Sequence, residues 1–326
     1  MDRAVNDHPN QPGAAPLPPD RGGVLTEQRN PRTADLHELG VAAIVERMQT
    51  EDRAVLEALE TARPVLVALL EDAEARFFRG GRLVYLGAGT SGRLGVLDAS
   101  EAPPTFHVEP GRVVGLIAGG DAALRRSSEH REDEPEGARE QLEALHLTDD
   151  DTVIGIAAGG TTPYPRGALT IAKSIAPSCL TALLSCAPVE PPPNADHTVV
   201  IPTGPEVITG STRMKAGTAT KLALNTISTT LMIREGRVFE NLMVDLRATN
   251  DKLRDRAARI ITTLTGLERN AAMALLERAG GEVKTSIVMH RIGVDADKAR
   301  RVLQAAKGRL ADALTDPSKS NTREQR

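Results

Sequence analysis

The sequence predicts an α/β protein in which a doubly wound parallel sheet follows N-terminal helices and precedes a small C-terminal helical bundle. Five short apolar runs alternate with amphipathic stretches between residues 83 and 201, as buried parallel strands and their crossover helices do. Before these runs, from Asp35 to about Arg79, apolar residues recur at three- and four-residue steps. The chain from Leu253 to about Leu314 again has a helical pattern.

The same patterns divide the chain into four parts. Residues 1–24 are rich in proline and poor in large apolar residues, which predicts a disordered leader. Residues 25–252 hold the predicted sheet together with an N-terminal helical arm. Residues 253–314 form the predicted bundle, and residues 315–326 read as a polar tail.

Each element of the sheet domain has a local basis. The five apolar runs, several of them bounded by glycine, predict strands at Leu83–Leu86, Val113–Ile117, Val153–Ala157, Leu180–Leu184 and Val199–Ile201. The stretches between and after them predict helices over 92–100, 121–129, 134–145, 164–175 and 216–235. In the bundle, Gly280-Gly281 and Gly293 split the segment after residue 266 into three short helices.

Composition excludes several classes of function. The chain has 326 residues, a formal net charge of −4 and only six aromatic side chains, so it is a poor nucleic-acid binder. No apolar run approaches the roughly 20 residues that cross a bilayer, and the first residues lack a secretory signal. Cys179 and Cys186 fit a reducing cytoplasm, and the seven scattered histidines form no zinc motif.

The first polar loop follows the first predicted strand, in LVYLGAGTSGRLG. Gly87, Gly89 and Gly92 spell G-x-G-x-x-G, but no acidic residue ends the second strand where a dinucleotide site wants one. Thr90 and Ser91 place two hydroxyls where a helix begins, and a helix N-terminus favours an anion. The turn therefore predicts a site for a terminal phosphate monoester, with a ligand-free tight turn as the alternative.

Two further polar loops follow later strands. The loop 157–163 carries Thr161 and Thr162, and the loop 203–221 carries hydroxyls and cations at Ser211, Thr212, Arg213, Lys215 and Thr218. Loops at the carboxyl ends of parallel strands converge on one crevice. Together they predict a sugar-phosphate pocket without a metal. For the third loop, a helix start capped by Ser211 or Thr212 is the structural alternative.

Carboxylates are the candidate acids and bases, because the predicted pocket has no histidine and no activated serine or cysteine. Asp98 and Glu101 lie three residues apart and share a helix face, which Pro103-Pro104 is expected to end. The segment SSEHREDEPE supplies more carboxylates, including Glu132, but most of it reads as a solvated surface. Residue patterns alone do not single out Glu132.

Several long motifs resemble the N-acetylmuramic acid 6-phosphate etherase family, which belongs to the SIS (sugar isomerase) fold group. The motifs are TEQRNPRTADL (26–36), LGAGTSGRLGVLDASEAPPTF (86–106), GLIAGG (115–120), GPEVITGSTRMKAGTATKLALN (204–225) and NLMVDLRATNDKL (241–253). The resemblance implies a SIS-type sheet and cleavage of the lactyl ether of N-acetylmuramic acid 6-phosphate in cell-wall sugar recycling. The products would be D-lactate and N-acetylglucosamine 6-phosphate, made with no cofactor or metal.

The resemblance also implies roles for single residues. Glu101 would be the acid that protonates the departing lactate, and Glu132 the base that takes the C2 proton. Thr90, Ser91, Ser211 and Thr212 would contact phosphate and sugar. Lys215 and the second-loop residues Gly159 and Thr161 complete the predicted binding set, although Gly159 and Thr161 stand where the family commonly has serine and arginine.

Spacing raises the question of which subunit supplies Glu101. Glu101 comes ten residues after Ser91, about 15 Å along a straight helix. That exceeds the gap from a hexose 6-phosphate to its C2–C3 bond, unless the helix ends early and turns back. SIS proteins usually pair, so a homodimer in which one subunit lends residues to the other is expected.

Two other functions stay open at this point. A non-catalytic phosphosugar sensor, like the regulatory cousin of this family, is favoured by the altered second loop. Retention of both Glu101 and Glu132 favours the enzyme. A phosphosugar isomerase of the same fold would use other sequence blocks, and the RMKAGT stretch argues against it.

Overall fold

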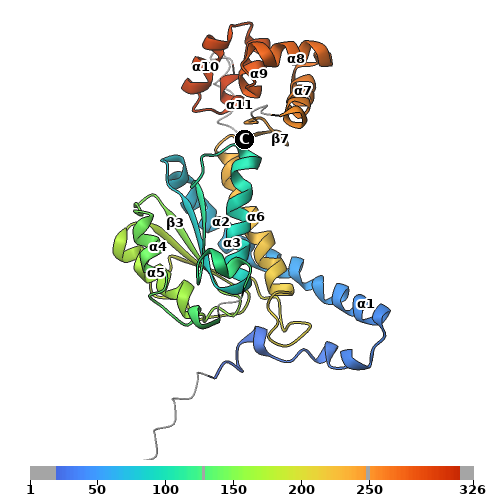
Figure 1. The fold of residues 1–326 in the computed structure, drawn as a ribbon, viewed down its shortest axis with the longest axis vertical. Coiled ribbons are helices and arrows are strands. Elements are labelled where there is room, and N and C mark those ends of the chain that lie inside the picture. Colours follow the sequence, from blue (N-terminus) through green and yellow to red (C-terminus); the bar gives the residue numbers. More distant parts are fainter. Residues whose placement is uncertain (1–19, 127–128, 247–249, 316–326) are drawn as a thin grey trace, which may run out of the picture.

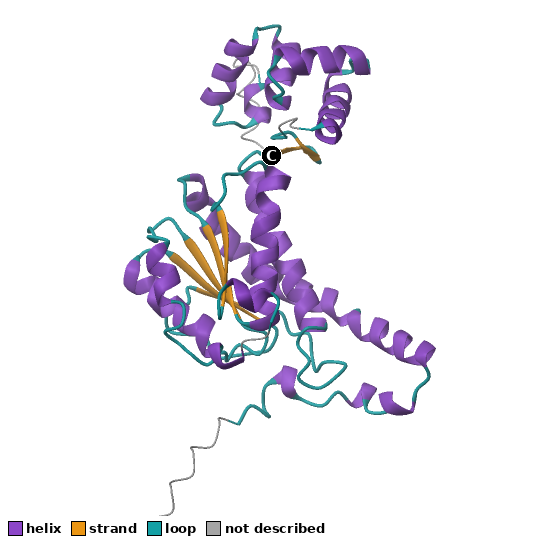
Figure 2. Cartoon of the chain, viewed as in Figure 1, coloured by secondary structure: helices purple, strands orange, loops and turns teal. Residues whose placement is uncertain are grey.

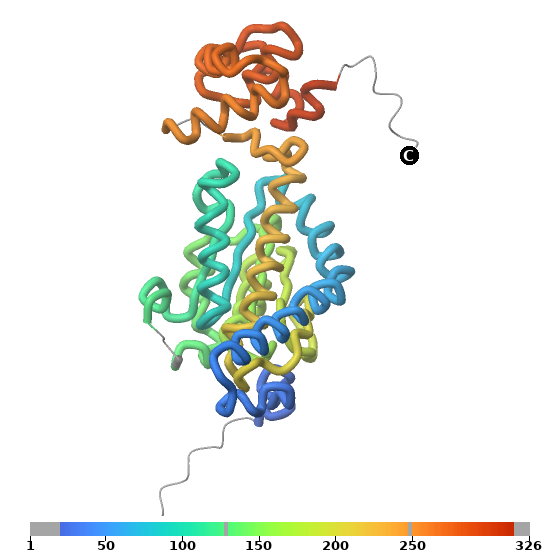
Figure 3. The backbone as a smooth tube through the Cα atoms, turned by 90° about the vertical axis from the view of Figure 1, so that its right-hand side faces the viewer, coloured from blue at the N-terminus to red at the C-terminus, as the bar shows by residue number. Residues whose placement is uncertain are grey.

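A five-stranded sheet covered by helices on both faces forms the body of the protein in the computed structural model, which describes residues 20–126, 129–246 and 250–315 (Figure 1). The strands fan out beside the long helices in Figure 2. Figure 3 shows the C-terminal helices gathered at one end of the molecule, with the N-terminal arm toward the other. The predicted doubly wound sheet is confirmed.

All five strands of the sheet run parallel, in the order β2-β1-β3-β4-β5. Each overlaps a run predicted from the sequence, and its ends differ from those of the run by at most two residues. Their bounds are β1 Leu83–Gly87, β2 Val113–Ile117, β3 Thr152–Ile156, β4 Leu180–Ser185 and β5 His197–Val200. The strand order reverses between β1 and β3, and such a switch point opens a crevice at the carboxyl ends of the strands.

Helices of the arm and the body close both faces of the sheet. Three short 3₁₀ helices come first among the described residues, followed by α1 Val41–Asp52 and α2 Ala54–Phe78. With α2, the helices α3 Gly89–Phe106 and α6 Lys215–Arg234 cover one face, and α4 Arg139–Ala144 and α5 Pro163–Ile175 cover the other. The 3₁₀ bounds are η1 Leu25–Glu27, η2 Pro31–Thr33 and η3 Leu36–Glu38, with η4 Asp121–Leu124 and η5 Glu129–Arg131 later.

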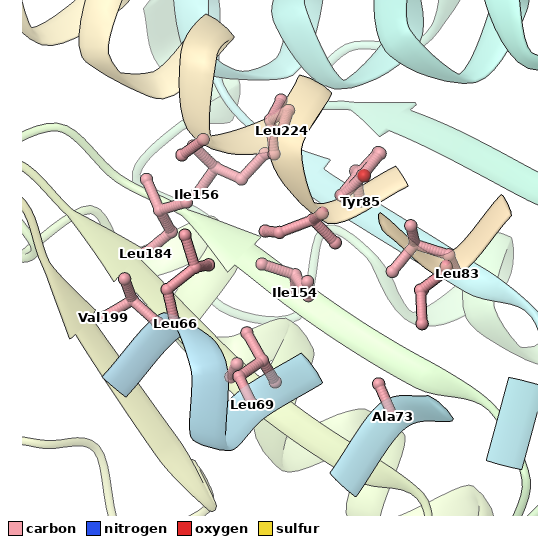
Figure 4. Close-up of a cluster of buried hydrophobic side chains, with 14 of the residues drawn as sticks. Leu66, Leu69, Ala73, Leu83, Tyr85, Ile154, Ile156, Leu184, Val199 and Leu224 are labelled. Carbon is pink, nitrogen blue, oxygen red and sulfur yellow. The ribbon is translucent and has the colours of Figure 1, made fainter. Parts of the chain in front are cut away.

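The larger core lies between the sheet and α2, α3 and α6. Leu66 and Leu69 of α2 meet Ile154 and Ile156 of β3, and Leu224 of α6 closes the cluster (Figure 4). These side chains are at most 7% exposed. Burial on both faces explains why the strands read as continuous apolar runs rather than alternating ones.

Three predicted helices differ from the observed ones. The prolines at 103 and 104 do not end α3, which continues to Phe106 because Ala102 and Phe106 are buried in the core and the missing proline N–H groups cost only two bonds. The predicted helix 134–145 is reduced to α4, because a turn at Gly137 precedes it. The predicted helix 121–129 is only the short η4, and residues 127–128 lie outside the described residues.

The C-terminal helices enclose a core of their own. They are α7 Asp251–Thr265, α8 Arg269–Arg278, α9 Val283–Ile292, α10 Ala296–Ala305 and α11 Leu310–Ala313, one short helix more than predicted. A small antiparallel hairpin, β6 Val238–Phe239 and β7 Leu242–Met243, was not predicted and leads into them. Val244 and Leu246 already belong to this core, upstream of the predicted start at Leu253.

Ion pairs connect the body to the C-terminal core. Arg237, just after α6, contacts the Asp245 carboxylate at 3.1 Å, and Lys284 of α9 contacts the same carboxylate at 2.9 Å. Within the residues that the structure covers, no helix has both the length and the apolar character needed to cross a membrane.

Candidate functional site

A polar cavity of about 250 Å³ opens at the switch point between β1 and β3. Loops that follow these two strands provide most of its wall, and the third polar loop provides Gly210 and Thr212. Glu132 and a short N-terminal stretch complete it. The lining residues are Arg21, Val24, Glu27, Ala88, Gly89, Thr90, Ser91, Glu132, Ile156, Ala158, Gly159, Thr161, Thr162, Gly210 and Thr212.

The first loop brings the start of α3 against the end of β1. A Cβ on Gly92 would lie 2.4 Å from the Gly87 carbonyl oxygen and 2.6 Å from Ile117, so only glycine allows this approach. Thr90 and Ser91 stand in the first turn of α3, whose N–H groups have no partner within the helix. The glycines thus have a packing role, and they leave an anion-binding helix start facing the cavity.

The second loop both lines the cavity and fixes Glu132. The Tyr164 N–H at the start of α5 donates to the Glu132 carbonyl oxygen at 3.0 Å. Gly160 has φ +74°, and a Cβ there would lie 2.8 Å from Ser185 Oγ. Gly159 and Thr161 line the cavity on either side of this turn. The backbone bond holds Glu132 beside the loop that the sequence placed in the site.

The third loop differs from its predicted role. The buried Glu206 carboxylate accepts the N–H groups of Lys215 and Ala216 at 3.0 and 2.9 Å, so it caps α6. Neither Ser211 nor Thr212 is the cap. Because a carboxylate of the protein already occupies this helix start, a phosphate has no place there, and only Gly210 and Thr212 reach the cavity. Ser211 does not line it.

Lys215 is fully buried and also stays outside the cavity. Its ammonium donates to the Glu51 carboxylate at 3.0 Å. Arg32 and Asn30 bond the same carboxylate. Hydrogen bonds from Arg32, then from Lys215 and Asn30, lower the pKa of Glu51 to about 2. This network joins the N-terminal segment to the start of α6.

Glu101 lies far along α3 from the cavity. The helix is continuous from Gly89 to Phe106, so the early end that would let Glu101 turn back does not occur. Glu101 is exposed, whereas Asp98, one turn earlier, is buried. Tyr85, Asn225 and Ser228 donate hydrogen bonds to Asp98. Burial raises the pKa of the Asp98 carboxyl.

The N-terminal stretch is the part of the wall that the sequence pattern did not single out. Residues 1–19 of the predicted leader lie outside the described residues, but Arg21 and Val24 line the cavity. Glu27 joins them. The only signal for it in the sequence is the TEQRN block, which belongs to the motifs of the family resemblance.

The cavity presents hydroxyls, backbone N–H groups, two carboxylates and the Arg21 guanidinium. Five lining hydroxyls and the α3 N-terminus suit a phosphate and a sugar, and Glu132 offers proton transfer. Within the described ranges, no group of three or more His, Cys, Asp or Glu side chains gathers as a metal ion would require.

Fold and cavity together define a phosphosugar-binding protein of the SIS type. The family model of the glucokinase regulatory protein N-terminal SIS domain matches residues 65–173. The N-acetylmuramic acid 6-phosphate etherase of Synechococcus sp. (strain CC9605) is 49% identical over 312 residues, which cover 95% of this chain and 96% of that protein. The etherase of Serratia proteamaculans (strain 568) is 49% identical, with 90% and 99% covered. The chain belongs to the N-acetylmuramic acid 6-phosphate etherase family.

Proposed function

We propose that this protein cleaves the lactyl ether of N-acetylmuramic acid 6-phosphate and releases D-lactate and N-acetylglucosamine 6-phosphate. The observation that carries the proposal is the shared cavity of Thr90 and Ser91, at the start of α3, and the Glu132 carboxylate. It joins an anion site to a base. Near-complete coverage of etherases at 49% identity supports the same substrate.

The proposed mechanism is an elimination followed by addition of water. The phosphate lies at the α3 N-terminus, and the ring opens to an aldehyde that acidifies the C2 proton. Glu132 takes that proton, a C2–C3 double bond forms, and the C3–O bond breaks with its electron pair leaving on lactate. An acid protonates the lactate oxygen. Water then adds to C3 and a proton returns to C2, so no electrons are gained or lost overall.

We assign the acid to Glu101 of the partner in a homodimer. Within one subunit the continuous α3 carries Glu101 about 15 Å from Ser91, which supports supply across an interface. Exposed apolar side chains on the arm support pairing as well, because Val41 is 80% and Leu56 63% exposed. In Figure 1, α1 projects from the body, where a second copy can reach it.

The binding set divides into direct and indirect contacts. We propose that Thr90, Ser91, Gly159, Thr161 and Thr212 contact the substrate, since they line the cavity. Lys215 is proposed to act indirectly, through Glu51. Ser211 is proposed to shape the third loop, where its carbonyl oxygen accepts the Met214 N–H at 3.2 Å.

We also propose a division of the chain into two units and a location in the cytoplasm. Residues 25–252 would hold the substrate together with Arg21 and Val24, and 253–314 would be an appended unit whose core also takes in Val244 and Leu246. Cys179 and Cys186 are both free and buried, and thiols of this kind suit a reducing cytoplasm.

A non-catalytic phosphosugar regulator is the second candidate, suggested by the match to the glucokinase regulatory protein domain over 65–173, but the etherase relatives support the catalytic function over it. The deciding experiment incubates the protein with N-acetylmuramic acid 6-phosphate and measures D-lactate. Release of lactate supports the etherase. Binding of the sugar phosphate without lactate supports the regulator.

Replacement of the base sharpens this experiment. Glu132→Gln keeps the shape of the side chain but cannot take a proton, so exchange of the C2 hydrogen with deuterated water should stop. Glu140→Gln, a change of an exposed carboxylate on α4, is the matched control and should exchange normally. Normal exchange by Glu132→Gln would remove Glu132 from the mechanism.

A further inference from the structure

We propose that Glu27 is a substrate-contacting residue of this site, whose carboxylate accepts hydrogen bonds from the sugar. The inference goes beyond the proposed acid and base and names a specificity-determining contact. It rests on the proposed function only for the identity of the sugar. The hydroxyls of the cavity and the start of α3 support a phosphosugar as its ligand.

The first observation is the position of the Glu27 side chain. It lines the cavity with Thr90, Ser91 and Glu132. Among the residues that the structure describes, no side chain or backbone N–H hydrogen-bonds or ion-pairs with its carboxylate. A carboxylate only accepts hydrogen bonds, and one that stays ionised in a polar cavity is stabilised by donors. Glu27 is exposed, so its carboxylate is open to a ligand as a hydrogen-bond acceptor and has no partner among the described residues.

The second observation is that the Glu27 carboxylate packs against a glycine of the third loop. Gly210 has φ +74°, and a Cβ at that position would lie 2.9 Å from Glu27 Oε2. The carboxylate therefore rests against the bare backbone of the third loop. A side chain at residue 210 would push it away. Gly210 itself lines the cavity beside it.

The third observation is that the segment carrying Glu27 is firmly attached. The Gly210 N–H donates to the Thr26 carbonyl oxygen at 3.2 Å. Asn30 donates to Glu51 at 2.8 Å, and the Thr33 hydroxyl donates to the Val207 carbonyl oxygen at 2.8 Å. Anchors on both sides hold the Glu27 backbone in place before any ligand arrives, which lowers the entropy cost of binding.

Electrostatics orders the ligand within the cavity. A phosphate is stabilised at the start of α3 and repelled by a carboxylate, so the sugar rather than the phosphate faces Glu27. Sugar hydroxyls and an acetamido N–H are the donors that such a carboxylate recognises. Bonds of this charge-assisted kind discriminate strongly against ligands that lack the donor.

Calorimetric titration with two probes, N-acetylglucosamine 6-phosphate and inorganic phosphate, tests the inference. Glu27→Gln and Glu27→Ala should lower the affinity for the sugar phosphate about tenfold or more and leave the affinity for inorganic phosphate unchanged. Glu109→Gln, an exposed carboxylate beyond α3, is the control and should bind both probes as wild type does. Thermal melting of both Glu27 variants should match wild type, since the Glu27 side chain has no hydrogen bond or ion pair with any residue that the structure describes.

Two results would overturn the inference. Unchanged sugar-phosphate affinity in both Glu27 variants would show that the carboxylate touches no ligand. Tighter inorganic phosphate with unchanged sugar selectivity would place Glu27 beside the phosphate instead. Because these measurements need no turnover, a protein that binds the sugar phosphate but releases no lactate would refute the etherase and still test Glu27.

Discussion

Lys215 and Glu51 form an ion pair of 3.0 Å inside the protein, although 164 residues separate them in the sequence. Lys215 is 0% and Glu51 3% exposed. The pair joins the first turn of α6 to the end of α1, and Arg32 adds the N-terminal segment at 2.8 Å. The wall of the cavity that carries Glu27 therefore depends on a contact outside the cavity.

Loss of Lys215 should destabilise the fold. Lys215→Met leaves Glu51 with one cation fewer in the interior, and breaking a buried pair costs about 3 kcal/mol or more. Urea denaturation gives the free energy of unfolding. Arg79→Gln, which breaks the partly exposed pair with Asp150, is the control and should cost no more than about 1 kcal/mol. Equal losses in the two variants would contradict the buried-pair account.

Acid should weaken the fold through Glu51. Its pKa falls from an ordinary value of 4.5 to about 2 on folding. The folded pKa is the lower one, so this stabilisation, about 3 kcal/mol, is complete above pH 4.5 and is lost as the pH falls toward 2. The difference in unfolding free energy between wild type and Glu51→Gln should shrink over that range. A difference that stays constant with pH would argue against it.

Adjacent glycines of the second loop should respond differently to alanine. A Cβ on Gly159 would meet Val24 at 3.2 Å and Thr26 Oγ1 at 3.4 Å, both on side chains that can give way. A Cβ on Gly160 would meet Ser185 and Val189 at 2.8 Å from a left-handed backbone. Gly159→Ala should cost less than about 1 kcal/mol and Gly160→Ala about 2 kcal/mol or more. The melting temperatures of the two variants show which substitution destabilises the protein more.

Asp98 should tolerate asparagine but not alanine. Burial raises the pKa of this carboxyl in the folded state, so its ionisation opposes folding as the pH rises above its ordinary value of 3.8. Asp98→Asn removes that opposition and should be at least as stable as wild type at pH 7. Asp98→Ala strands the donors of Tyr85, Asn225 and Ser228 and should cost about 2 kcal/mol. Denaturation at pH 4 and pH 7 separates the two effects.

Mixing two inactive variants tests the shared site. If Glu101 serves the partner's cavity, a hybrid dimer of Glu101→Gln and Glu132→Gln has one site with both carboxylates. The two unfolded variants are mixed and refolded together. Lactate should then be released at a rate of up to about a quarter of the wild-type rate, if each change alone abolishes activity. Each variant refolded alone is the control. If the mixture forms dimers but releases no lactate, the acid and the base belong to one subunit.

The fold could be predicted where residues act locally or in regular patterns. Five apolar runs gave the strands, because strands buried on both faces need continuous apolar sequence. The end of α3 could not be predicted, because Phe106 is held in helix by a core assembled from distant segments. Tertiary packing there outweighs the local cost of two prolines.

The site was predictable in part for the same reason. Thr90, Ser91 and Thr161 follow strands directly, so their convergence follows from parallel topology. The sequence predicts that Lys215 contacts the ligand, because it cannot show that Glu51 of α1 pairs with this side chain in the folded protein. Glu27 belongs to the TEQRN block of the family resemblance, but no residue pattern assigns it to the site, since only the anchoring of its segment to the third loop places it in the cavity.

Helix α3 extends from the wall of the cavity to the segment that contacts the C-terminal core. It begins with Gly89 in the cavity wall and stops before His107, whose carbonyl oxygen accepts a bond from Arg237, the residue that pairs with Asp245 next to the C-terminal core. Its 18 residues make a rod of about 27 Å. A tilt of about 3° at the ligand end therefore displaces the far end by more than an ångström. Helix α3 therefore joins the wall of the cavity to the segment that contacts the C-terminal core.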